Sequence, residues 1–238
     1  MTSSEPREIN LDEIKGILES GDFKDFIDVR ENSHFEAKQK KPYDFSNTPQ
    51  FVSVSKLATD IGSIANNDEA FIICGLTTTK PLNSSHDIVS GLELFPESEF
   101  YTDTQIQGII KSSIFPKLKV ELTWYPSKDD KSLGLGVIFI PKQEEEKKYF
   151  IVSVCEADGQ QFKGFVGIPV RNDDTLRWFK PQEVYEQMRK LPTSHQVMFQ
   201  TISNQLEQIS EKISVMDTST PLMPDILQER IEEALDEQ

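Results

Sequence analysis

The chain has 238 residues, of which 37% are hydrophobic and 27% are charged, a composition typical of one globular domain with an appendage or of two small domains. Its formal net charge of −15 argues against non-specific nucleic-acid binding, which requires a basic surface. No run of about 18 apolar residues predicts a membrane span. The N-terminus lacks the basic and then apolar pattern of a secretory signal, so we expect a cytoplasmic protein.

Residues 1–27 are predicted to be an N-terminal helical segment. Asn10 is a good N-cap, and two acidic residues follow it in the first turn, where they favour the helix dipole. Three apolar residues share one helical face, namely Leu11, Ile14 and Leu18. Gly21 is expected to end this helix.

Residues 28–191 are predicted to form an α+β domain with a mixed or antiparallel sheet and packed helices. Alternating or continuous apolar patterns predict strands over 33–40, 70–76, 118–125, 133–140, 148–154 and 162–170. Helical periodicity predicts helices over 53–67, 103–114 and 180–190. The last four strands follow one another with short polar loops, so we expect an antiparallel meander in the second half.

Residues 192–238 are predicted to be a C-terminal extension of acidic helices with coiled-coil character. Six apolar residues recur at spacings of three and four, namely Phe199, Ile202, Leu206, Ile209, Ile213 and Met216. The pattern fits a helix that packs back on its own domain, or a short coiled coil that joins chains into a homo-oligomer through residues 196–217. From Leu191 onward there are nine acids and two bases, so the segment is also suited to recruiting a partner protein.

The stretch RENSHFEAKQKKP, residues 30–42, contains the best candidate for a site with chemistry. Glu36 and Lys38 are two apart on a predicted strand, so their side chains project from one face. Glu31 joins them only if it precedes the strand, on a turn or at a helix end. Two carboxylates suit Mg²⁺ or Mn²⁺, and a neighbouring lysine can hold a phosphate oxygen. The alternative is an ordinary surface ion pair on an edge strand.

Five segments in order resemble the Schlafen AlbA-type (divergent AAA-associated) DNA-binding domain family. They are ENSHFEAKQKK, VSKLATDIGSIANNDEAFIICGL, DIVSGLE, QIQGIIKSSIFPKLKVE and GFVGIPVRNDDTLRWFKPQEVYEQMR. The resemblance covers roughly residues 28–190. It implies nucleic-acid binding, of RNA or single-stranded DNA, and membership of a bacterial defence or regulatory system.

In nuclease members of that family, two glutamates and an aspartate form a metal-dependent site that cleaves RNA. The resemblance therefore implies that Glu31 and Glu36 are metal ligands and catalytic residues, with Lys38 as the catalytic lysine beside them. The aspartate is missing, because Thr77 or Thr78 stands at its position.

The sequence does not identify the third acidic metal ligand, and it also allows two other interpretations of the site. Three acids from nearby loops are candidates for the third ligand, namely Asp68, Glu69 and Asp87. A restriction-endonuclease-like set of Asp28, Glu36 and Lys38 would keep the chemistry without the family. A catalytically degenerate scaffold that recruits a partner through its C-terminal helices would have no chemistry at all.

Polar side chains outside this stretch complete the predicted nucleic-acid-binding set. It comprises Lys38, Lys40, Lys41, Asn66, Arg171, Arg177 and Trp178. Arginine beside tryptophan can grip a phosphate and stack a base. The structural alternatives are a buried tryptophan anchor with an arginine paired to Asp173 or Asp174, and a helix-capping role for Asn66.

Overall fold

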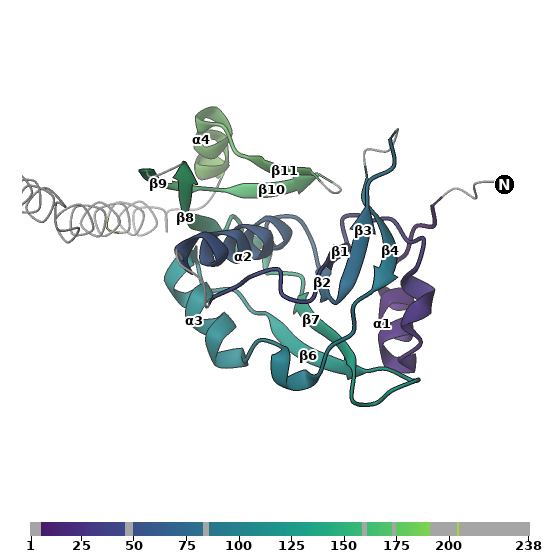
Figure 1. Cartoon of the computed structure of the whole chain (residues 1–238). Coiled ribbons are helices and arrows are strands. Elements are labelled where there is room, and N and C mark those ends of the chain that lie inside the picture. Colours follow the sequence, from purple (N-terminus) through teal and green to yellow (C-terminus); the bar gives the residue numbers. More distant parts are fainter. Residues whose placement is uncertain are drawn as a thin grey trace, which may run out of the picture. The chain divides into compact units, whose positions relative to one another are not determined.

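The computed structural model describes residues 6–45, 50–82, 86–158, 161–172, 175–190 and 204 (Figure 1). Residues 1–191 form one compact unit and residues 192–238 another. The helical segment predicted over 1–27 is thus part of the same unit as the sheet. Apart from Asn204, the predicted coiled coil lies outside the described residues. No helix in the described ranges is long and apolar enough to cross a membrane.

Helix α1 (Leu11–Ser20) has the ends that the sequence predicts. The Asn10 side chain accepts a hydrogen bond from the Glu13 amide, and the Glu13 side chain accepts one from the Asn10 amide, which is a capping box. Gly21 follows the helix with φ of 70°, in the left-handed region that glycine favours.

The central sheet has four strands in the order β1-β2-β7-β6. Its members are β1 (Phe35–Lys38), β2 (Ala70–Cys74), β6 (Glu121–Pro126) and β7 (Gly134–Ile140). Strand β1 runs parallel to β2, and the other two pairs are antiparallel. The parallel pair is joined through helix α2 (Gln50–Ala65), as a parallel crossover requires.

The remaining elements form small sheets and further helices. They are β3 (Leu76–Thr79), β4 (Ile88–Leu92), α3 (Asp103–Ser113), β5 (Ile114–Phe115), β8 (Ile151–Asp158), β9 (Gln161–Gly167), β10 (Pro169–Asn172), β11 (Thr175–Trp178) and α4 (Pro181–Lys190). Short 3₁₀ turns occur at Phe23–Phe26, Glu97–Glu99 and Glu145–Lys147. The α+β class is therefore confirmed.

The predicted meander is wrong in its connectivity. Strand β7 is buried along almost its whole length and pairs with β2 on one side and β6 on the other, so it has no free edge for β8. Strand β8 instead lies in a second sheet of order β5-β8-β9. The strand predicted over 162–170 also divides at Ile168, and Pro169, which lacks an amide hydrogen, begins β10.

Alternation along the strands separates two hydrophobic cores. Phe35, Ala37, Phe71 and Ile73 face the core that contains α1. Ile72 faces the core built on α2 and α3. Because successive side chains on a strand point to opposite faces, Glu36 and Lys38 of β1 are directed to the α2 side of the sheet.

Candidate functional site

Glu36 lies at the centre of a buried charge cluster. One of its carboxylate oxygens forms an ion pair with Lys38 from the same strand, and the other with Arg171 from β10. Glu36 is 6% exposed and Arg171 is 8% exposed. The structure thus brings together residues 135 apart in the chain, with both glutamate oxygens paired to cations.

Lys38 extends the cluster to helix α2. Its Nζ lies 3.6 Å from Asp60 Oδ2, and the hydroxyl of Tyr43 donates a 2.7 Å hydrogen bond to the same oxygen. Tyr43 is buried, and this burial raises its pKa well above its ordinary value, with the negative charge of Asp60 adding to the effect. Tyr43 therefore remains a donor near neutral pH.

Glu31 precedes β1 on a turn, as its participation requires. The turn is closed by hydrogen bonds between the backbones of Asn32 and Phe35, and it returns Glu31 to the strand. Its Oε1 accepts a 2.8 Å hydrogen bond from the Ala37 amide, one residue along from Glu36. The structure thus places Glu31 on the turn before β1, with its carboxyl group bonded to the residue between Glu36 and Lys38.

The pKa of Glu31 is raised from its ordinary value, chiefly because burial penalises the charged form. The Ala37 hydrogen bond and the positive charges of Lys38 and Arg171 act in the opposite direction, whereas Asp87 adds to the rise. Both cations and a further carboxylate therefore lie within electrostatic range of Glu31.

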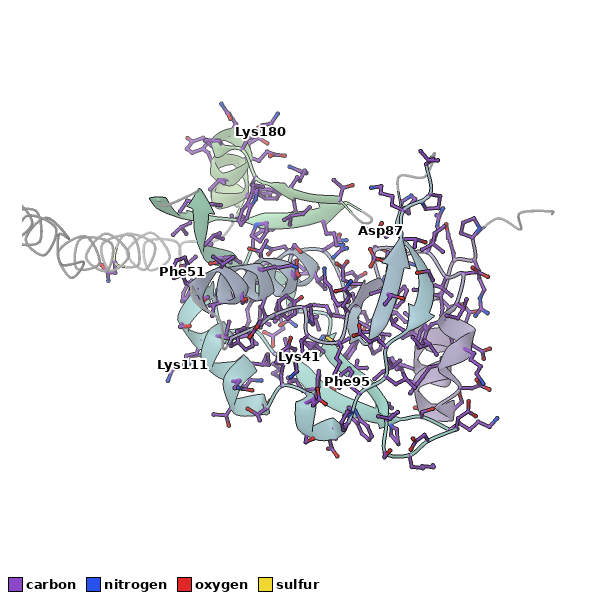
Figure 2. The ribbon with its side chains drawn as sticks, viewed as in Figure 1. Lys41, Phe51, Asp87, Phe95, Lys111 and Lys180 are labelled. Carbon is purple, nitrogen blue, oxygen red and sulfur yellow. The ribbon has the colours of Figure 1, made fainter. Side chains whose placement is uncertain are left out.

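Of the three candidates for a third acid, Asp87 is the one placed beside Glu31. The Glu31 amide donates a 2.9 Å hydrogen bond to the Asp87 carbonyl. Asp87 is the residue immediately before β4 and is labelled in Figure 2. Asp68 pairs instead with Lys142, at 3.4 Å. The Glu69 carbonyl bonds the ring of His34, at the end of β1 away from Lys38.

This arrangement does not fit Mg²⁺ or Mn²⁺. Both oxygens of Glu36 already face cations, and a carboxylate so neutralised is a poor ligand. Within the described ranges, no three His, Cys, Asp or Glu side chains gather closely enough to hold a metal ion. The residues are those expected of a catalytic site, but their pairing is that of a structural charge network.

The restriction-endonuclease-like set is not assembled either. Asp28 occupies a left-handed turn, with φ of 63°, where its amide donates to the Val89 carbonyl and its carbonyl accepts from the Arg7 amide. Among the ion pairs and hydrogen bonds of the described residues, none links Asp28 to Glu36 or Lys38.

Lys40 and Lys41, predicted to bind phosphates, both form an ion pair with Glu99. Their Nζ atoms lie 3.0 Å and 3.6 Å from Glu99 Oε2. Lys41 and Asp87 lie well apart in Figure 2. The two lysines thus share a surface ion pair and are not part of the buried cluster.

Asn66 is a structural residue at the end of α2. Its side-chain amide donates 2.8 Å hydrogen bonds to the carbonyls of Phe150 and Pro169, and its oxygen accepts one from the Phe150 amide. Asn66 is 6% exposed, so no group remains to contact a phosphate. The predicted phosphate contact is replaced by a junction between α2, β10 and the residue before β8.

Arg177 and Trp178 both have partners within the protein. Arg177 pairs with Glu183, at 2.9 Å, whereas Asp173 and Asp174, the acids predicted to pair with an arginine, lie outside the described residues. Trp178 is half-buried and packs edge-on against Phe165, with ring centroids 5.0 Å apart.

Arg171 and Arg177 cannot grip one phosphate together. Arg171 pairs across the hairpin with Leu176, and Arg177 pairs with Val170. Neighbouring residues of a strand point to opposite faces, so the two arginines face away from one another.

Two members of the cluster, Asp60 and Tyr43, are not among the residues predicted from the sequence. Asp60 lies between Leu57 and Ile61, on the apolar face of α2, and an acid at such a position signals a buried partner. A cavity of about 460 Å³ lies elsewhere, lined by the start of α1 with the three residues before it and by residues 30 and 32–34, and none of the predicted site residues lines it.

The chain matches no protein-family model, and no curated protein matches it. The Schlafen AlbA-type resemblance therefore stays a prediction from the five sequence segments.

Proposed function

We propose that this chain is a non-catalytic interaction protein. The unit of residues 1–191 is a structural platform, and the acidic C-terminal segment assembles it with other protein chains. The observation that carries the proposal is the pairing of both Glu36 oxygens with Lys38 and Arg171 in a buried position. There the carboxylate of Glu36 and the two cations Lys38 and Arg171 are already paired with one another.

The charge distribution supports the same proposal. The chain carries −15 overall, and the lysines predicted to meet phosphates are paired with Glu99 or Glu36. Nucleic-acid affinity depends on cations that are available to replace condensed counterions. A protein partner with a basic surface suits this chain better than RNA or DNA.

A metal-dependent ribonuclease is the second candidate, because one observation favours it. Glu36 pairs with Lys38, the Ala37 amide between them donates to Glu31, and the Asp87 backbone lies beside Glu31. A substrate-induced rearrangement that frees Glu36 is the condition for this function.

An assay of two variants beside the wild type distinguishes the two proposed functions. Wild type, Glu36→Gln and Glu183→Gln are incubated with labelled RNA and single-stranded DNA in Mg²⁺ or Mn²⁺, and their unfolding in urea is measured. Glu183 is the control because its ion pair with Arg177 is on the surface.

For a non-catalytic platform we expect no cleavage by any of the three proteins. Glu36→Gln should lose about 3 kcal/mol of unfolding free energy, because it removes the buried carboxylate that pairs with Arg171 and Lys38. Glu183→Gln should lose less than about 1 kcal/mol, as is usual for an exposed pair. Cleavage by wild type that disappears in a folded Glu36→Gln protein would reject the proposal in favour of the ribonuclease.

A further inference from the structure

Arg171, one of the two cations that pair with Glu36, belongs to a hairpin near the C-terminal end of residues 1–191. Strands β10 and β11 form their own two-stranded sheet, which shares no strand with the central sheet. Arg171 is at the third position of β10, and its guanidinium reaches Glu36 of β1. The hairpin is thus bridged to the sheet by a charge rather than by a ladder of backbone hydrogen bonds.

The start of the hairpin is fixed at a second point. The Pro169 carbonyl accepts a hydrogen bond from Asn66 at the end of α2. A Cβ on Gly62 of α2 would lie 3.4 Å from the Pro169 ring, so the helix and the hairpin are in close contact. Because side chains two residues apart on a strand point to the same face, Arg171 extends from the side of β10 that Pro169 holds against α2, and it reaches Glu36 of β1.

Among the described residues, four carboxylates and two cations are associated with this cluster. The acids are Glu31, Glu36, Asp60 and Asp87, and the cations are Lys38 and Arg171. Glu31 and Glu36 are buried, and a buried negative charge without a cation is costly, so loss of Arg171 should leave the cluster in need of another cation. Arginine is well suited to this position because it stays charged and is less strongly hydrated than lysine.

We propose that Arg171 is a built-in cation that occupies the place where a divalent metal would neutralise Glu31 and Glu36, and that it straps the β10–β11 hairpin to the sheet. The platform is then held together without a metal. The strap also links β1 mechanically to α4, the last element before residue 192, and so to the segment proposed to assemble with other chains.

The test is whether removal of Arg171 turns the cluster into a cation site. Wild type, Arg171→Met and Arg177→Met are melted in EDTA and in increasing Mn²⁺, with unfolding followed by circular dichroism. Arg177 is the matched control, because it lies on the same hairpin but pairs with the surface residue Glu183. The readout is melting temperature, so it is separate from the cleavage assay above.

We expect the melting temperatures of wild type and Arg177→Met to be the same in EDTA and in Mn²⁺. Arg171→Met should melt lower in EDTA, and its melting temperature should rise with each tenfold increase in Mn²⁺. Adding Glu36→Gln to Arg171→Met should remove this dependence, because the ion would lose its ligand.

Two results would overturn the inference. One is an Arg171→Met protein that is as stable as wild type in EDTA, since the Arg171–Glu36 ion pair would then contribute nothing to stability. The other is an Arg171→Met protein that is unstable or unfolded in EDTA and gains nothing from Mn²⁺. Arg171→Lys is the control for a purely steric explanation. Because lysine keeps a cation at this position, the melting temperature of this variant should not change with Mn²⁺.

Discussion

At the scale of single residues, Glu31 shows how a fold changes the chemistry of a side chain. Its pKa is raised chiefly by burial. A carboxyl group with a raised folded-state pKa favours the folded state below the unfolded pKa of about 4, and this contribution is lost as pH rises through the folded-state value. The pH dependence of stability therefore reports its environment directly.

We expect Glu31→Gln to gain stability relative to wild type as pH rises from about 4 to about 7. Glutamine imitates the protonated acid and keeps an acceptor for the Ala37 amide. Unfolding in urea at a series of pH values measures the difference. Glu183→Gln should show the opposite sign, because the Lys180 amide lowers the pKa of Glu183. A pH-independent difference for Glu31→Gln would contradict the assigned burial effect.

Asn66 allows a second comparison at this scale. Asn66→Ala leaves the backbone groups of Phe150 and Pro169 without their partner, so we expect a loss of roughly 2–4 kcal/mol in unfolding free energy. Asn67→Ala is the matched control, because this neighbouring side chain is exposed. Equal stability of the two variants would show that the junction is not important.

At the scale of elements, the helices were predicted better than the strands. Caps and 3.6-residue periodicity are local, and α1, α2, α3 and α4 all lie within or beside the predicted ranges. Strand lengths depend on the partners that the fold supplies. The predicted strand 33–40 is reduced to Phe35–Lys38, because only these residues find a register with β2.

Two helical glycines should respond oppositely to alanine. A Cβ at Gly16 of α1 meets nothing within 4 Å, so Gly16→Ala should stabilise the protein by about 0.5–1 kcal/mol through helix propensity. A Cβ at Gly62 of α2 would lie 2.4 Å from Val152 Cγ2, so Gly62→Ala should destabilise it. Thermal unfolding measures both, and a stabilised Gly62→Ala protein would show that the α2–β8 contact yields easily.

At the scale of the whole molecule, the division at residue 191 separates the platform from the segment with the heptad pattern. If that pattern joins chains, truncation after Lys190 should give a monomer, as measured by light scattering after size exclusion. In the full chain, Leu206→Glu should also dissociate the assembly, whereas Gln205→Glu beside it should not. An unchanged mass in the Leu206→Glu protein would place the interface elsewhere.

The sequence by itself determined the α+β class and the approximate helix ranges, because these follow from local spacing, and the same spacing selected Glu31, Glu36 and Lys38 as candidates. It did not reveal that Arg171 pairs with Glu36, that Asp60 and Tyr43 complete the cluster, or that Asn66 joins three segments. Those contacts link residues that only the packing of α2 and the β10–β11 hairpin against β1 brings together. Tertiary structure decided the role of Glu36, because a carboxylate's chemistry depends on which charges surround it and on how far it is removed from water.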